Sequence, residues 1–300
     1  MNGKLDMVVF NVQSANCIWI STPNNKNFVF DIGTGTTNYG YEFNPLTYIY
    51  NQGVRTIHAL VLTHPHSDHV AGIDKLGLFT IGTLYCARNI SRGDILNGNM
   101  YGTANWVDSY LNLESGYRTP FSWNESPFNP GNNGGVKVQT FSQSTTAISN
   151  LNNRSIVSVV EYLGFKVLLP GDAEPAAFRV LMGDAPFLEA LAGVNVMVVP
   201  HHGRESGYCA ELFDHFTPQV CVVSDGEVQE TDATSKYSAK ATGVTVINRD
   251  SGQIERNRKC LTTRNDGVMR FSFSINPTSC QGEYTVETHL YMEVQYAQYT

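Results

Sequence analysis

The sequence predicts a mixed α/β fold in which short buried strands end in polar turns and lead into helical segments. One such strand is Ala59–Leu62, four apolar residues followed directly by a polar turn at 63–69. A second apolar run, 194–199, ends at Pro200, and a hairpin of 156–162 and 165–169 turns at Gly164. Strands that alternate with helices in this way are typical of α/β proteins.

Apolar runs and alternation place the other elements. Strands are expected at 7–12, 17–20, 28–30, 81–86, 136–141, 220–223, 244–248 and 269–273. Helices are expected near 39–52, 103–113, 175–191 and 210–216, the third being broken near Gly183 and Pro186. The last segment, 284–300, alternates apolar and polar residues and is expected to add one strand at the edge of a sheet.

Length and composition allow one sizeable core. The 300 residues are 42% hydrophobic and 16% charged. We expect a single domain over 1–300, with 87–150 as an irregular, lid-like insertion and 276–300 as a C-terminal extension. The insertion is rich in Asn, Ser, Gly and Tyr, and long irregular segments within compact domains are often functional.

Aromatic and basic residues of this insertion are candidates for substrate contact. A lid over a site would bring Trp106 and Arg118 to the substrate, together with Tyr101, Tyr117 and Trp123, because aromatic rings stack on bases. For any single ring, packing of the insertion against the rest of the domain is the simpler interpretation.

The charge and the cysteines limit partners and location. A formal charge of −7 argues against a broad basic face for duplex nucleic acid, but bound cations would still allow a phosphodiester substrate. No signal peptide and no apolar run of membrane length is visible, so no membrane partner is expected. Six scattered cysteines without a Cys-x-x-Cys pair favour reduced thiols and a cytoplasmic location.

The strongest functional signal is a cluster of metal-binding side chains in the turn at 63–69. His64, His66, Asp68 and His69 lie within six residues, although the chain has only eight histidines. Imidazole and carboxylate groups are the usual ligands of zinc and related divalent ions. A tight turn after a strand gives no packing reason to cluster histidines, so a set of surface residues is the weaker interpretation.

Polar residues at three other strand ends extend this signal. Asp172 follows the strand that ends at 169, and a carboxylate there has two oxygens with which to bridge two cations. His201 and His202 follow the strand at 194–199, and one of them is expected to be a ligand. Asp31, at the end of the strand at 28–30, either supports the site or only forms the turn.

The order of these motifs resembles one branch of the metallo-β-lactamase fold superfamily. His-x-His-x-Asp-His is followed by Asn-Asn-x-Ser, by Gly-Asp at a hairpin end and by Pro-His-His-Gly, as in the hydrolase domain of ComEC-type DNA-uptake proteins and their stand-alone relatives. The resemblance covers about residues 7–275. It implies a four-layer αββα sandwich and the hydrolysis of phosphodiester bonds.

The resemblance also implies a ligand set for two divalent metal ions, zinc or manganese. His64 and His66 would hold one ion, Asp68, His69 and His201 the other, and Asp172 would bridge them. The choice between His201 and His202 stays open. Asn152 stands where many members of the superfamily have a third histidine, which implies a looser first site or a preference for manganese.

Two departures from the branch bear on the substrate. Asn11 and Asn16 stand where the branch has carboxylates, and Arg204 replaces a serine after the histidine pair. Arg204 would either clamp a phosphate or pair with a surface carboxylate.

The expected activity is metal-assisted hydrolysis of a nucleic-acid or nucleotide phosphodiester. Metal-bound water would supply the nucleophile, Asp68 would orient it, and His202 would give a proton to the leaving oxygen. One alternative is a small-molecule ester, lactone or thioester hydrolase. Another is a catalytically silent module of a defence or toxin system that needs a protein partner. The sequence leaves the oligomeric state open.

Overall fold

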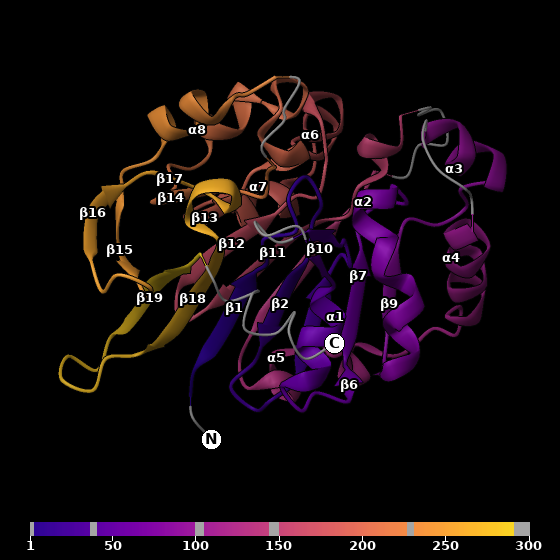
Figure 1. The fold of residues 1–300 in the computed structure, drawn as a ribbon, viewed down its shortest axis with the longest axis horizontal. Helices are drawn as coiled ribbons and strands as arrows, with labels where there is room; N and C mark the ends of the chain where they lie inside the picture. Colours follow the sequence, from indigo (N-terminus) through magenta and orange to yellow (C-terminus); the bar gives the residue numbers. More distant parts are fainter. Residues whose placement is uncertain (1–2, 37–40, 100–104, 144–149, 227–230, 291–300) are drawn as a thin grey trace.

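Two large β-sheets pack face to face, with helices on both outer faces (Figure 1). The computed structural model describes residues 3–36, 41–99, 105–143, 150–226 and 231–290. The nine-stranded sheet has the order β16-β15-β19-β18-β1-β2-β3-β7-β9, and the six-stranded sheet has the order β10-β11-β12-β13-β14-β17. The expected four-layer αββα architecture is therefore confirmed.

The larger sheet gathers strands from both halves of the chain. Its members are β1 (Leu5–Val9), β2 (Ile18–Ser21), β3 (Asn27–Phe30), β7 (Ala59–Leu62), β9 (Leu84–Cys86), β15 (Val244–Asn248), β16 (Ile254–Arg258), β18 (Val268–Ile275) and β19 (Gly282–His289). The smaller sheet contains β10 (Lys137–Phe141), β11 (Val157–Tyr162), β12 (Phe165–Leu169), β13 (Val194–Val198), β14 (Val220–Val223) and β17 (Cys260–Thr262). Two short pairs, β4 (Gly35–Thr36) with β5 (Glu42–Phe43) and β6 (Thr56–Ile57) with β8 (Thr80–Ile81), complete the strands of the described residues.

The α-helices are short. They are α1 (Pro45–Asn51), α2 (Ser67–Val70), α3 (Arg92–Gly98), α4 (Asn105–Gly116), α5 (Pro130–Asn133), α6 (Pro175–Leu181), α7 (Ala185–Leu191), α8 (Thr234–Lys240) and α9 (Thr263–Asp266). The 3-10 helices are η1 (Ala71–Leu78), η2 (Trp123–Glu125), η3 (Leu151–Arg154), η4 (Pro200–Gly203), η5 (Glu205–Gly207) and η6 (Ala210–Asp214). Among the described residues, no helix has both the length and the apolar content needed to span a bilayer.

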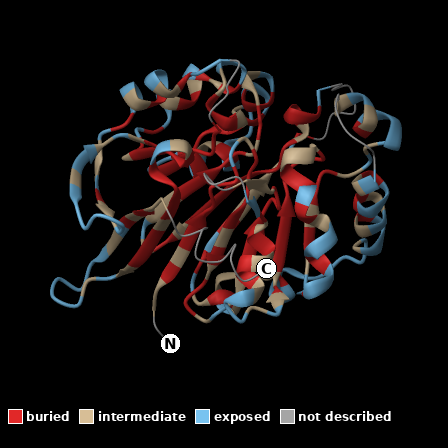
Figure 2. Ribbon diagram, in the orientation of Figure 1, coloured by how far each residue is buried: buried red, intermediate tan, exposed pale blue. Residues whose placement is uncertain are grey.

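The main core lies between the inner faces of the two sheets. Alternate residues of each strand point inward, so Phe28 and Phe30 of β3 meet Val160, Val167 and Val196 of the facing sheet. Figure 2 shows the central strands as an almost continuous buried layer. Each large side chain buried here contributes about 1.5–3 kcal/mol of transfer free energy. This core therefore holds the two sheets, and the strand ends that they carry, in fixed positions.

The C-terminal strand does not lie where the sequence suggested. The expected edge strand is β19, and it pairs with β18 on one side and with β15 on the other, inside the nine-stranded sheet. The edge is formed instead by β16, which was not expected. Its residues are mostly exposed, so it lacks the apolar alternation that marks a half-buried strand.

The segment at 87–150 is more regular than its composition suggested. Within its described residues, α4 buries Val107 and Tyr110 against the outer face of the nine-stranded sheet, and β10 forms an edge of the smaller sheet. Its polar composition reflects one exposed face on each helix rather than an absence of structure. Tyr101 lies outside the described residues.

Replacement of Phe30 by Ala tests the inter-sheet core. The ring is 1% exposed, so Phe30→Ala is expected to lower the free energy of unfolding by about 3–5 kcal/mol through lost burial and a cavity. Val180→Ala on the exposed face of α6 is the control, expected within about 0.5 kcal/mol of the parent. Urea unfolding followed by circular dichroism measures both, and equal losses in the two variants would contradict the assignment.

Candidate metal centre

The candidate metal centre is formed where strand ends of the two sheets meet. In the larger sheet, β3 and β7 are parallel neighbours, and in the smaller sheet β12 and β13 are parallel neighbours. The carboxyl ends of all four lie at the same end of the sandwich. The Ile156 N–H donates to the Thr63 carbonyl at 3.0 Å, and the Asp172 N–H donates to Ser155 Oγ at 3.2 Å. The first bond joins the two sheets at the site, and the second positions Asp172 at the end of the smaller sheet.

One set of side chains, which we call the second donor group, combines two carboxylates and two imidazoles. Asp68, His69, Asp172 and His202 each offer a ligand atom, and these atoms all lie within 4.8 Å of one another. His69 Nε2 is 3.1 Å from Asp172 Oδ1, and His202 Nε2 is 3.3 Å from Asp68 Oδ2 and 3.5 Å from Asp172 Oδ2. The turn at 63–69 thus meets strand ends of the other sheet.

The first donor group consists of His64, His66 and Asp172. His64 Nε2 and His66 Nδ1 lie 2.9 Å apart, so both rings point ligand nitrogens at the same space. Asp172 belongs to both groups and is 2% exposed. A single carboxylate shared by two donor sets is the arrangement that bridges a pair of divalent ions.

A buried carboxylate behind the site fixes one of these rings. Asp31 Oδ2 accepts from His69 Nδ1 at 2.7 Å and from Asn16 Nδ2 at 2.8 Å, while its Oδ1 accepts from the Thr63 N–H at 2.7 Å. Asp31 is 0% exposed. Of the two roles considered for Asp31, support of the site is therefore the one confirmed, since a carboxylate behind a ligand histidine fixes its tautomer and orientation.

The other rings are also held from behind. His64 Nδ1 lies 3.1 Å from Thr63 Oγ1 and 3.3 Å from Ser155 Oγ, and His202 Nδ1 lies 3.0 Å from the Ser224 carbonyl. In each ring one nitrogen is used for support, which leaves Nε2 to face the site. Gly171, at a φ of 57°, permits this close assembly, because a Cβ there would lie 2.7 Å from Thr63 Cβ.

Charges at the site fit a divalent cation. Burial disfavours a charged ring, yet Asp172, Asp31 and Asp68 outweigh it and raise the pKa of His69 well above its usual value. The same balance between burial and nearby carboxylates raises the pKa of His202 to about 9. Burial, reinforced by the neighbouring His69, lowers the pKa of His64 well below its usual value. The second donor group therefore stabilises positive charge, which a divalent ion would supply, and His64 is held as the neutral, ligating form.

The structure allocates the two consecutive histidines differently from the sequence expectation. His202, not His201, lies in the second donor group. His201 Nε2 is 4.0 Å from Asp172 Oδ2, and its Nδ1 is 2.8 Å from Ser206 Oγ and 3.5 Å from Glu174 Oε1. Both histidines have positive φ values, 52° and 53°, so their rings diverge although they are adjacent in the chain.

Asn152 and Arg204 lie beside His201. Asn152 Nδ2 is 3.1 Å from Glu174 Oε1 and 3.4 Å from His201 Nε2, and its buried Oδ1 has no hydrogen-bond partner among the described residues. Burial lowers the pKa of His201, Asp172 opposes that effect, and the positive charges of His202 and Arg204 lower it further. Arg204 lies in the same turn as His201, and its backbone N–H donates to the His201 carbonyl at 2.9 Å.

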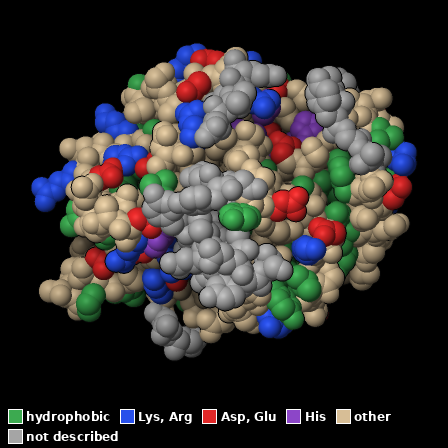
Figure 3. Space-filling view, viewed as in Figure 1, with side chains coloured by type: hydrophobic (Ala, Val, Ile, Leu, Met, Phe, Trp, Pro, Cys, Tyr) green, Lys and Arg blue, Asp and Glu red, His purple; other side chains and the backbone are tan. Residues whose placement is uncertain are grey.

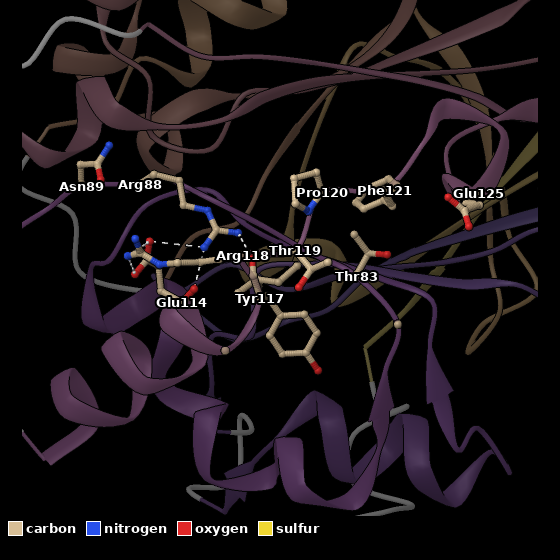
Figure 4. Close-up of a pocket in the computed structure, with 13 residues that line it drawn as sticks. Thr83, Arg88, Asn89, Glu114, Tyr117, Arg118, Thr119, Pro120, Phe121 and Glu125 are labelled. Atoms are coloured by element: carbon tan, nitrogen blue, oxygen red, sulfur yellow. Dashed lines mark hydrogen bonds and ion pairs between the residues drawn. The ribbon is translucent and has the colours of Figure 1, made fainter.

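The other two substrate candidates lie in different places. Arg118 lines a cavity of about 770 Å³ beside β9, together with Arg88, Tyr117 and Phe121 (Figure 4). Its Nη2 is 2.7 Å from Glu114 Oε2, and the lining of this cavity includes no residue of either donor group. Trp106 is partly buried against the outer core of the nine-stranded sheet. Neither residue is brought to the donor groups.

Two members of the donor groups reach the surface: the Asp68 side chain is 36% exposed, and His66 is half-buried. The space-filling view shows a histidine side chain near the upper edge of the molecule, next to acidic and basic side chains (Figure 3). The insertion reaches this region as well: Asn99 Oδ1 accepts from the Ser67 N–H at 2.9 Å, and a Cβ at Gly98 would lie 3.5 Å from His66 Nε2. The C-terminal end of α3 thus forms one wall of the site.

Several supporting residues were not singled out from the sequence for the roles they have. Asn16, Thr63, Ser155, Ser206 and Ser224 are common polar residues, and most were passed over for that reason. Position carried some signal, because Thr63 precedes the histidine cluster and Ser155 belongs to Asn-Asn-x-Ser. Ser206 and Ser224 had no such signal, since their roles depend on how distant segments pack.

Comparison with known families adds the evidence for identity. A family model described as "Metallo-beta-lactamase superfamily" matches residues 11–218, which is well over half of the chain. The chain belongs to this superfamily. The matched span includes both donor groups of this superfamily member, together with His201 and Asn152. Among curated proteins, no match to the chain was found.

Solved structures resemble this superfamily member at low identity. A mutant of CmlA beta-hydroxylase has a TM-score of 0.48 at 11% identity, covering 89% of this chain and 53% of its own. CmlA, a diiron beta-hydroxylase from Streptomyces venezuelae, has a TM-score of 0.47 at 12% identity, and the match covers 86% of this chain and 53% of CmlA. A putative metal-dependent hydrolase from Parabacteroides distasonis has a TM-score of 0.40 at 12% identity, and the match covers 85% of this chain and 91% of the hydrolase. The chain spans about half the length of the two CmlA structures.

Replacement of Asp31 tests the support of the second donor group. Asp31→Asn removes the charged acceptor behind His69, and loss of such support is expected to weaken binding of a divalent ion by about 10–100-fold. Zinc and manganese titrations by calorimetry, with metal content measured after dialysis, check this. Asp74→Asn on the exposed surface should bind divalent ions as tightly as the parent does. An unchanged metal affinity in Asp31→Asn would rule out a role of Asp31 in supporting the second donor group.

Proposed function

We propose that the protein is a dinuclear metal-dependent hydrolase that cleaves phosphodiester bonds in nucleic-acid or nucleotide substrates. The observation that carries the proposal is the pair of donor groups that share Asp172. Two ions held about 3.5–4 Å apart stabilise both the attacking and the leaving oxygen of a phosphoryl group. The resemblance of the motif order to the ComEC-type branch supports the substrate class, and we propose membership of that branch.

The residues have separate tasks in this proposal. His64 and His66 would hold one ion, Asp68, His69 and His202 the other, and Asp172 would face both. When bound, the two ions activate water and neutralise charge on the phosphoryl oxygens. Asp31 and the Ser224 carbonyl keep the His69 and His202 rings oriented. His202 is thus proposed as a ligand rather than as the proton donor expected from the sequence.

Arg204 favours an anionic substrate. No carboxylate in the described part of the chain lies within ion-pair distance of its guanidinium, and its backbone N–H donates to the carbonyl of His201 beside the donor groups. A guanidinium that has no carboxylate partner among the described residues is suited to a phosphate, which it binds in a fixed geometry. A neutral ester would gain little from it. We therefore place phosphodiesters ahead of esters, lactones and thioesters as substrates.

Removal of either carboxylate, the shared Asp172 or Asp68 of the second donor group, is expected to abolish the activity. Asp172→Ala and Asp68→Ala should each lower metal-dependent cleavage at least 1000-fold, since each deletes an anionic ligand. The measurement is cleavage of single- and double-stranded DNA and RNA and of bis(4-nitrophenyl) phosphate, with manganese or zinc added.

Asp108→Asn, on the exposed face of α4, is the control and should keep full activity. A parent protein that cleaves carboxylic esters but none of the phosphodiesters would replace the proposal with an ester hydrolase. A parent that binds two metals yet cleaves nothing would point to a module that needs a protein partner.

Asn152 is expected to influence which metal the site prefers. An amide oxygen is a poorer zinc ligand than imidazole, so we propose that the parent favours manganese at the first donor group. Asn152→His should raise zinc affinity relative to manganese by about tenfold or more. Competition dialysis with metal analysis measures this ratio, and an unchanged or lower zinc preference would show that position 152 does not face the ion.

A further inference from the structure

His201 belongs to neither donor group but lies at the open side of both. Its Nε2 is 4.0 Å from Asp172 Oδ2, and its side chain is 13% exposed, whereas those of His69 and His202 are 0% and 4% exposed. A molecule arriving from solvent at the bridging carboxylate would therefore meet this ring. The two ligand rings behind it are closed off from such contact.

The ring is held in this position at some energetic cost. His201 and His202 are consecutive non-glycine residues with left-handed φ values of 52° and 53°, a conformation that L side chains adopt only at a cost. This backbone turns one ring into the second donor group and the other out of it, with ring centroids 6.4 Å apart. The Ser206 hydroxyl lies 2.8 Å from His201 Nδ1, and it donates to that nitrogen in the tautomer that carries the ring proton on Nε2.

A second N–H group points to the same place. Asn152 Nδ2 carries two hydrogens and accepts none, and Glu174 Oε1, at 3.1 Å, takes one of them. The other is directed toward His201 Nε2, 3.4 Å away. With a proton on Nε2, these two donors do not bond to each other, and an anionic oxygen placed between them would accept from both.

Charges of both signs lie near this pair. Arg204 follows in the same turn, its backbone N–H donating to the His201 carbonyl at 2.9 Å, and the described residues offer its guanidinium no carboxylate within ion-pair distance. The Glu174 carboxylate lies on the other side of the ring, with Oε1 3.5 Å from His201 Nδ1. The segments 150–154 and 200–204 meet beside Asp172, where His201 faces Oδ2, the carboxylate oxygen that His69 does not contact.

We infer that His201 Nε2, Asn152 Nδ2 and the Arg204 guanidinium bind a non-bridging oxygen of the substrate's phosphoryl group. This inference rests on the proposed function, and it names the part of the site that distinguishes phosphodiesters from esters. A phosphodiester has two non-bridging oxygens, so one can face the cations while the other binds between His201, Asn152 and Arg204, which we call the cradle. A carboxylic ester has a single carbonyl oxygen and leaves the cradle empty.

The decisive variant is His201→Asn, because Asn tolerates the left-handed backbone while its shorter side chain withdraws the donor. The expected result is an unchanged content of two metal ions per chain, and calorimetric binding of inorganic phosphate to the metal-loaded protein about tenfold weaker or more. Arg204→Met should weaken phosphate binding similarly. Ser206→Ala should have a smaller effect, because it removes only the group that fixes the ring proton.

A stereochemical measurement distinguishes the specific loss of phosphoryl-oxygen binding from a general loss of structure. Oligonucleotides with one pure Rp or Sp phosphorothioate at the cleavage site replace one non-bridging oxygen by sulfur, which accepts hydrogen bonds poorly. The parent should cleave the two isomers at different rates, and His201→Asn should bring the ratio of these two rates closer to one. His215→Asn and Arg256→Met, both exposed, are the matched controls and should match the parent in every measurement.

Three outcomes would overturn the inference. Loss of a metal ion in His201→Asn would make His201 a ligand. If His201→Asn keeps both metals, the phosphate affinity and the isomer ratio of the parent, these residues do not bind the phosphoryl oxygen. The same conclusion follows if the metal-loaded parent binds no phosphate. A parent that binds phosphate through these residues yet cleaves no phosphodiester would instead refute the proposed function and leave the anion site standing.

Discussion

The buried Asp31 carboxylate is the constraint on which the metal centre depends. It accepts from the Thr63 backbone, from the His69 ring and from Asn16, and so joins the end of β3 to the turn after β7. A fully buried carboxylate is tolerable only when its oxygens are satisfied in this way. Its partners are therefore fixed as firmly as the core itself, and the orientation of His69 follows from the packing of two adjacent strands.

The same constraint explains why the site lies at the junction of the two sheets. Neither sheet alone carries a complete set of ligands: His64, His66, Asp68 and His69 follow a strand of the larger sheet, whereas Asp172 and His202 follow strands of the smaller one. The inter-sheet core must pack before the donor atoms approach one another. Stability and metal binding are coupled for this reason, since an ion that binds only the assembled site stabilises the assembled sandwich.

Much of this arrangement could be predicted from the sequence, because buried strands and the polar residues that end them are local signals. The strands before His64, Asp172 and His201 belong to that class, whereas the four-layer architecture was implied by the resemblance of the motif order. The allocation of His201 and His202 was not accessible, because it depends on two left-handed backbone conformations that no residue type in Pro-His-His-Gly demands. The role of Asp31 stayed open for a similar reason, since its side-chain partners come from two separate segments, Asn16 and the turn at 63–69.

Tertiary context also decided the elements that were misplaced. Strand β16 has a sequence of exposed, largely charged residues and exists because β15 offers it an edge. The helices of the insertion are polar on one face and rest on the outer core through a few residues such as Val107 and Tyr110. Periodicity over so short a stretch is too weak to distinguish such helices from a loop.

The position of β19 has a consequence for biosynthesis. Because β19 lies between β18 and β15, the last strand among the described residues is an interior member of the larger sheet. On the ribosome, β15 and β16 emerge well before the partner that connects them to the rest of that sheet. Until residues 282–289 leave the exit tunnel, β18 presents an unpaired flank, a surface for which chaperones and neighbouring nascent chains compete.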